Sequence, residues 1–127
     1  MNRVDFLAFS HLNLAQVELL DGRFDLAVLQ LSEAKKRLEA TALRADVRHF
    51  LNIANLVIAA GKSDRARFDR IFEEYEAGWP DNTRLRKDIP WMLEMAGDYA
   101  VERDADERAE KAWELAAVLW LRLEDES

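Results

Sequence analysis

Apolar and small residues recur in three segments of this chain with the spacing of one helix face. Within each segment they occupy positions i, i+4, i+7 and i+11, and the three segments begin at the evenly spaced Ala27, Phe68 and Ala109. The three sets are Ala27, Leu31, Ala34 and Leu38; Phe68, Phe72, Tyr75 and Trp79; and Ala109, Trp113, Ala116 and Trp120. Such a face is typical of an amphipathic helix packed on a neighbour. The pattern therefore predicts three equivalent helices in an internal repeat, each with a buried face.

A second helix is predicted before each of these, and it carries a small residue seven positions before a turn. The small residues are Ala15, Ala54 and Gly97, and the turns are placed at Gly22, Gly61 and Asp104. Small residues let two helix backbones approach, and glycine lets the chain reverse. The two alignments disagree by two positions in the middle repeat. We therefore expect a longer turn at 61–67 with Ser63 or Asp64 as the N-cap, or else an irregular middle pair.

The predicted fold class is all-α, with three antiparallel helix–turn–helix pairs in a single domain that covers residues 1–127. The predicted helices span about 4–20, 24–41, 45–60, 64–77, from 88 onward, and 106–123, in repeats at about 8–41, 47–80 and 88–123. Gly78 and Pro80 are predicted to end the fourth helix, because a residue before proline leaves the helical region. Pro90 is tolerated in the first turn of the fifth helix. The connector at 81–87 is the predicted hinge.

Composition and charge argue against several kinds of partner and site. The chain has 127 residues, of which 50% are hydrophobic and 34% charged, and this suits one folded domain with a real core. The net charge of −7 disfavours nucleic acid as a partner. The sequence contains no cysteine, so it has no disulfide and no thiolate metal site. No apolar run is long enough to cross a bilayer and no signal peptide is evident, so we expect a cytoplasmic protein without membrane insertion.

Catalytic chemistry is not expected. The sequence has no HExxH spacing, no phosphate-binding loop and no GxSxG motif. We expect His11 to face the partner helix as a hydrogen-bonded core residue and His49 to lie on a helix surface. Ser10 cannot form a dyad with the adjacent His11, because neighbouring helical residues point about 100° apart. We therefore expect no catalytic residue, no cofactor and no metal ligand.

These features resemble the tetratricopeptide repeat (TPR) family. The first unit carries the family pattern at Leu14, Ala15, Gly22, Phe24, Ala27, Leu31 and Ala34, and the third at Ala96, Gly97, Ala100, Ala109, Trp113 and Ala116. The second unit departs from the family pattern, because Phe68 and Tyr75 stand where the family prefers alanine. The spacing between repeats, 39 to 43 residues, is also longer than is usual in the family. The third unit is also similar to the degenerate TPR arrays of bacterial transcriptional regulators. The resemblance covers about residues 8–123 and implies a short right-handed solenoid.

The resemblance also implies a concave groove, lined by the first helix of each pair, that binds a peptide or helix of another protein. The family's groove positions correspond to Leu12, Asn13, Gln16, Arg48, Asn52, Asn55, Trp91, Glu94 and Asp98. Asparagine and glutamine can donate to and accept from a ligand backbone. Residues 81–127 carry a net charge of −6, so a basic or amphipathic partner is the expected complement. The alternatives are that the polar residues are a solvated face and that the acids serve solubility.

The last predicted helix has apolar residues outside its core face, at Leu115, Val118 and Leu121. An apolar outer strip on a terminal repeat favours a partner or a homodimer. The alternative is a broad core face with scattered exposed apolar residues. Besides a peptide-binding module, the sequence leaves open a small acidic chaperone that shields an apolar client segment, and a self-assembling structural unit.

Overall fold

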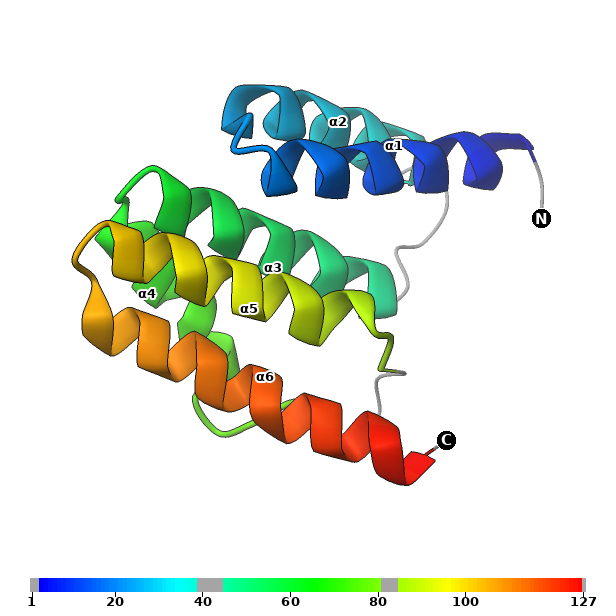
Figure 1. Cartoon of the computed structure of the whole chain (residues 1–127). Helices are drawn as coiled ribbons and strands as arrows, with labels where there is room; N and C mark the ends of the chain where they lie inside the picture. Colours follow the sequence, from blue (N-terminus) through cyan, green and yellow to red (C-terminus); the bar gives the residue numbers. More distant parts are fainter. Residues whose placement is uncertain (1–2, 39–44, 81–84, 127) are drawn as a thin grey trace.

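The computed structural model describes residues 3–38, 45–80 and 85–126, and throughout these ranges the chain is built from helices and short connections, without a strand (Figure 1). The helices are α1 (Arg3–Leu20), α2 (Phe24–Leu38), α3 (Ala45–Gly61), α4 (Arg65–Phe72), the 3₁₀ turn η1 (Glu73–Tyr75), α5 (Asp88–Glu102) and α6 (Asp106–Glu126). The prediction of an all-α chain with six helices that pack against one another is confirmed.

The end of α4 differs from its predicted position. The α4 helix was predicted to run to residue 77, and this is wrong, because the chain tightens into η1 after Phe72. The tighter turn and the positive φ of Gly78 (111°) bring Trp79 back onto Tyr75, with ring centroids 5.2 Å apart and nearly parallel planes. The predicted end of α2 at residue 41 and most of the predicted hinge, residues 81–84, lie outside the described residues.

The three pairs share a strict repeat at their turns, with equal steps along the sequence from one pair to the next. The first helices end at Leu20, Gly61 and Glu102, and the second helices begin at Phe24, Arg65 and Asp106. A residue with positive φ stands two positions after each first helix: Gly22 (74°), Ser63 (58°) and Asp104 (61°). In each turn the backbone N–H of the residue that follows the positive-φ residue donates to the carbonyl five residues before it, at 2.8–2.9 Å. This arrangement closes a helix C-terminus.

The predicted middle turn is therefore corrected. We expected a longer turn beginning at Gly61, but Gly61 is the last residue of α3 and the turn has the same length as the other two. The predicted N-cap is confirmed at Asp64, whose side chain accepts a hydrogen bond from the Arg67 backbone N–H at 3.2 Å. Glycine at position 61 has a different role, which lies in its packing.

The predicted apolar faces form most of the core. Ten of the twelve face residues are buried. The exceptions are Trp113, which is 37% exposed, and the half-buried Trp120. The expectation that Trp113 is a buried core residue is wrong, because α6 is the last helix of the described chain and the figures show no helix packed over its outer side (Figure 1). The Trp113 indole instead lies against Gly97, where an added Cβ would overlap the ring.

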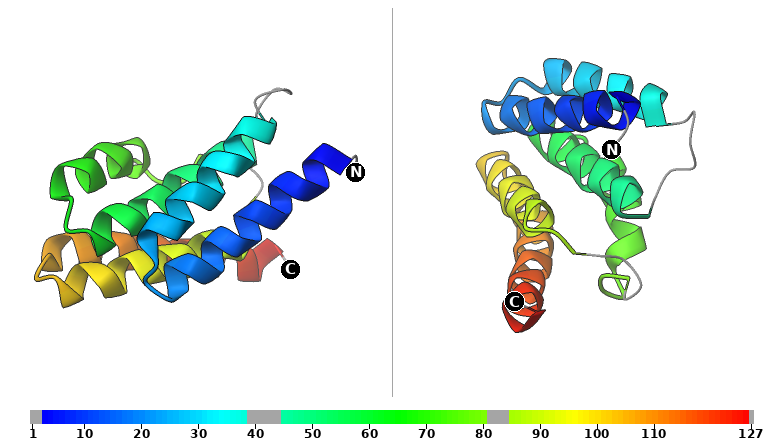
Figure 2. Two further views of the ribbon diagram at one scale, coloured as in Figure 1. Left: turned by 90° about the horizontal axis from the view of Figure 1, so that it is seen from above. Right: turned by 90° about the vertical axis from the view of Figure 1, so that its right-hand side faces the viewer.

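The α1–α2 hairpin packs closely on itself but touches the rest of the chain sparingly. The most extensive contacts are α1 with α2, α5 with α6 and α3 with α5, whereas the contacts of α3 with α1 and with α2 are few. Figures 1 and 2 show the hairpin lying across one side of the other helices. Its position is therefore set by a small number of contacts.

At the turn between α1 and α2, a joint formed by Phe24, Gly61 and Tyr99 connects the hairpin to the other helices. The Phe24 ring occupies the space where a Gly61 side chain would be. Phe24 also meets the Tyr99 ring edge to face, with centroids 5.0 Å apart. The Tyr99 hydroxyl donates to the carbonyls of Leu19 (2.5 Å) and Leu20 (3.2 Å) at the end of α1. One aromatic pair thus ties the hairpin to both α3 and α5.

Within the residues that the structure describes, no helix combines the length and the apolar character that a membrane crossing requires.

The contact of Phe24 with Gly61 predicts that Gly61→Ala destabilises the fold. A methyl group at this position must displace the Phe24 ring, so we expect a loss of roughly 1–3 kcal/mol in the free energy of unfolding, although alanine is the better helix former. Phe24→Leu in the same chain shortens the obstructing side chain and should recover part of the loss. Chemical denaturation of the two single variants and the double variant measures this coupling. If the stability changes of the two single variants simply add in the double variant, the loss in Gly61→Ala does not come from the contact with Phe24.

Candidate functional site

A groove of about 490 Å³ opens between α1, α3 and the start of α5. It lies at the end of these helices opposite the joint. The groove is lined by Phe9, Leu12, Asn13, Asp46, Val47, Phe50, Trp79, Arg86, Asp88 and Ile89. Six of the ten are apolar, and they come from all three helix pairs.

Helical spacing brings the apolar wall together. Phe9 and Leu12 are three residues apart on α1, as are Val47 and Phe50 on α3, so each pair presents adjacent side chains on one face. Trp79 reaches the groove because the chain reverses at Gly78. The groove is thus formed by elements that are distant in sequence.

The polar residues of the groove carry both signs of charge. Asp46 Oδ1 accepts a hydrogen bond from the Val47 backbone N–H at 3.0 Å, at the start of α3. Arg86 Nη2 lies 3.6 Å from Asp88 Oδ2. Asn13 adds an exposed amide from α1. These groups lie around an apolar surface and are suited to orient a ligand rather than to perform acid–base chemistry.

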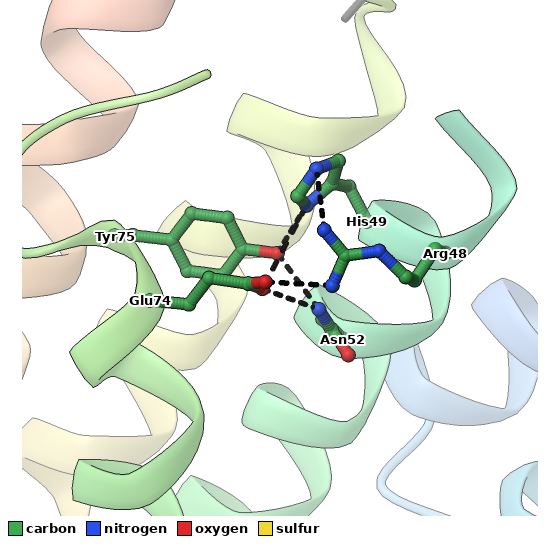
Figure 3. Close-up of polar contacts among 5 residues, drawn as sticks. All are labelled: Arg48, His49, Asn52, Glu74 and Tyr75. Carbon is green, nitrogen blue, oxygen red and sulfur yellow. Dashed lines mark hydrogen bonds and ion pairs between the residues drawn. The ribbon is translucent and has the colours of Figure 1, made fainter. Parts of the chain in front are cut away.

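A polar network between α3 and η1 supports the groove behind Trp79 (Figure 3). Arg48 and Asn52 each donate to the Glu74 carboxylate, at 2.6 and 2.7 Å. Asn52 also donates to the Tyr75 hydroxyl at 3.0 Å. These bonds fix the short η1 turn to α3, and they hold Tyr75 under the indole of Trp79.

His49 is the buried member of this network. We expected His49 on a helix surface, and this is wrong, because it is 1% exposed. Its Nε2 accepts from Arg48 at 3.3 Å, since arginine has only donors, so the neutral ring carries its proton on Nδ1. Nδ1 then donates to the Tyr75 oxygen at 2.6 Å. The ring also lies 5.0 Å from that of Trp79, so it forms part of the support of the groove.

The pKa values of His49 and Glu74 are both lowered in this network, for different reasons. Burial lowers the pKa of His49, the adjacent Arg48 cation lowers it further, and Glu74 opposes them. Burial alone would raise the pKa of Glu74, but hydrogen bonding and charge attraction from Arg48 outweigh it, and the pKa falls. Burial also raises the pKa of Tyr75. At neutral pH the network therefore holds a neutral imidazole and a carboxylate.

The structure does not gather the predicted groove residues in one place. Asn13 lines the groove, while Gln16 is buried and its Nε2 has no hydrogen-bond partner among the described residues. Arg48 and Asn52 are bound to Glu74, as above. Asn55 donates to the Leu51 carbonyl at 2.9 Å and accepts from Arg67 at 3.0 Å. The amides of Asn52 and Asn55, which we expected to hold a ligand backbone, thus make contacts within the fold.

The other three predicted positions lie together on the exposed side of α5. Trp91, Glu94 and Asp98 are all exposed there. The Trp113 indole N–H from α6 donates to the Glu94 carbonyl and to Asp98 Oδ1, both at 3.3 Å. This surface therefore belongs to the α5–α6 pair and is separate from the groove residues.

The predicted strip on α6 is only partly exposed. Leu115 is 8% exposed and belongs to the core, so its assignment to the outer strip is wrong. Val118 and Leu121 are exposed, at 59% and 63%. The core face of α6 is thus wider than the spacing suggested, and α6 packs extensively on α5. The expected role of His11 is confirmed: it is partly buried, and its Nδ1 lies 2.6 Å from Gln30 Oε1 on α2.

Of the groove lining, sequence reasoning identified Leu12 and Asn13 and missed the charged Asp46, Arg86 and Asp88. It also missed the apolar Phe9, Val47, Phe50, Trp79 and Ile89. Each of these apolar side chains resembles an ordinary core residue in the sequence. The describable part of the chain holds no cluster of three or more histidine, cysteine, aspartate or glutamate side chains able to hold a metal ion. Comparison of the chain with family models, with curated proteins and with solved structures found no match.

The lowered pKa of His49 predicts that stability falls as the solution becomes acidic. The unfolded chain binds a proton at His49 near pH 6.5, whereas the folded chain does so only at lower pH. The free energy of unfolding should therefore decrease as the pH drops below about 6.5, until the folded-state pKa is passed. His49→Gln should flatten this slope in denaturation experiments between pH 7.5 and 5. An unchanged slope would assign the pH dependence to other groups, since Glu74 acts only below its ordinary value of 4.5.

Proposed function

We propose that this chain is a non-catalytic interaction module, a short TPR-like solenoid that binds a segment of another protein in the groove between α1, α3 and α5. One observation carries the proposal. An apolar groove of about 490 Å³ is built from all three helix pairs, which makes it a property of the assembled fold. Its volume lies within the range of about 300–1,000 Å³ that is common for binding pockets.

The lining favours a ligand with apolar anchors. Phe9, Leu12, Val47, Phe50 and Ile89 offer no hydrogen-bonding groups on their side chains. Four of them are already buried and only Phe9 is partly exposed, so the gain on binding comes from burial of the Phe9 ring and of the ligand's own apolar side chains. An amphipathic helix supplies such anchors at positions i, i+3 or i+4 and i+7, and keeps its own backbone hydrogen bonds satisfied. A protein segment of this kind suits the groove better than a charged small molecule does.

Charge adds a preference for a basic ligand. Among the described residues that line the groove, Asp46 and Asp88 are negative and Arg86 is positive. Residues 81–127 carry a net charge of −6, so the wider field is negative as well. In partly solvated positions this favours association rate and orientation more than affinity. We therefore expect lysine or arginine beside the apolar anchors of the ligand.

The proposal is tested with a partner segment obtained by co-purification with the whole chain. Phe9→Glu places a charge in the apolar wall and should weaken binding by about tenfold or more, about 1.4 kcal/mol, in calorimetric titration. The control is Leu29→Glu on α2, where the side chain is 61% exposed and does not line the groove. Equal affinities for the two variants would exclude the groove as the binding site.

A further inference from the structure

The α1–α2 hairpin exposes an unusual share of the apolar surface. Thirteen large apolar side chains are exposed in the described part of the chain, and eight of them belong to this hairpin. Five form one face of α1, which we call the α1 outer face: Phe6, Leu7, Leu14, Val17 and Leu20. Phe6, Val17 and Leu20 lie within about 60° of one another around the helix axis.

The α1 outer face is also uncharged. Between Phe6 and Leu20 the sequence contains one residue among Asp, Glu, Lys and Arg, which is Glu18. The Glu18 side chain is only 17% exposed and lies 3.8 Å from Arg23. The Ser10 hydroxyl, within the same face, donates to the Phe6 carbonyl at 2.9 Å. Asn13 is exposed on the same face, and its position around the helix lies between those of Phe6 and Leu20. Burying this face therefore requires the desolvation of one amide but of no exposed charge.

We propose that the α1 outer face binds a second copy of this chain, through a two-fold interface that meets the proposed ligand groove only at its edge, at Asn13. The first argument is charge. Two copies that each carry −7 repel one another, so they can pair closely only where no like charges meet. The exposed strip at Val118 and Leu121 of α6 is less suitable, because Glu114, Glu124 and Asp125 are exposed beside it.

The second argument is area. A stable interface buries about 800 Å² on each partner, of which somewhat more than half is apolar. The five side chains of the α1 outer face expose roughly 450 Å², which supplies that apolar share and lies within the range for the largest patch on a monomer. A single patch therefore suffices for a dimer.

The third argument is self-complementarity. In a two-fold interface the same surface meets itself. An antiparallel pairing of two α1 helices about an axis near Leu14 sets Ser10 of one copy opposite Val17 of the other. These two positions lie about 20° apart around the helix at 100° per residue, so both face the axis. A small side chain thus meets a larger one across the axis, as close packing requires.

Light scattering on the whole chain at micromolar concentration tests the proposal. We expect twice the chain mass of 14.7 kDa for the wild type and for Val118→Glu, but the mass of one chain for Val17→Glu. The two variants are matched, because both introduce glutamate at a half-exposed valine, 53% exposed at Val17 and 59% at Val118. A monomeric wild type overturns the proposal, as does a Val17→Glu variant that remains dimeric.

A second variant keeps the test independent of these substitutions. The chain contains no cysteine, so Leu14→Cys introduces one thiol close to the proposed axis. Under mild oxidation it should form a disulfide-linked dimer, whereas Val118→Cys should not. Equal cross-linking of the two variants would reject the axis. The dimer and the groove are separable, since Val17→Glu should keep the partner affinity and Phe9→Glu should remain dimeric.

Discussion

The arrangement of this chain depends on the contact of Phe24 with Gly61 and Tyr99. The α1–α2 hairpin makes few other contacts with α3, so this joint fixes where the hairpin lies. The ion pair between Lys62 and Asp25, at 2.6 Å, lies beside the joint but is exposed. Exposed ion pairs contribute about 0–1 kcal/mol, whereas a buried aromatic ring contributes considerably more. The aromatic contact therefore dominates.

The joint and the groove lie at opposite ends of the same set of helices. At the joint the hairpin lies against the ends of α3 and α5, and at the other end the same helices border the groove. The polar network that includes His49, Glu74 and Tyr75 is drawn in Figure 3. The rings of His49 and Tyr75 lie against that of Trp79 and hold it in the groove wall. The site thus needs long-range packing on one side and a local polar network on the other. The network lies within the second helix pair, whereas the joint requires residues from all three.

Much of the fold followed from helical spacing, because the apolar faces recur at equal intervals along the chain and each face needs a neighbour. The middle turn was misplaced since Gly61 looks like a turn glycine. Its actual role depends on Phe24, which is distant in the sequence and which no local pattern reveals. His49 was misjudged for a similar reason, because its partner Tyr75 follows a different helix. The groove was mostly invisible, since its wall residues read as core until the helices are placed.

A direct test of the joint is the distance between the hairpin and α5 at the groove end. Spin labels on cysteines introduced at Lys36 and Lys87, both exposed, would report it by pulsed electron resonance in protein diluted with unlabelled chain. If the joint fixes the hairpin, we expect one narrow distance distribution in the otherwise native chain. We expect a broad one when Phe24→Ala and Tyr99→Phe remove the joint. An equally narrow distribution in that variant would contradict this and show that other contacts hold the hairpin in place.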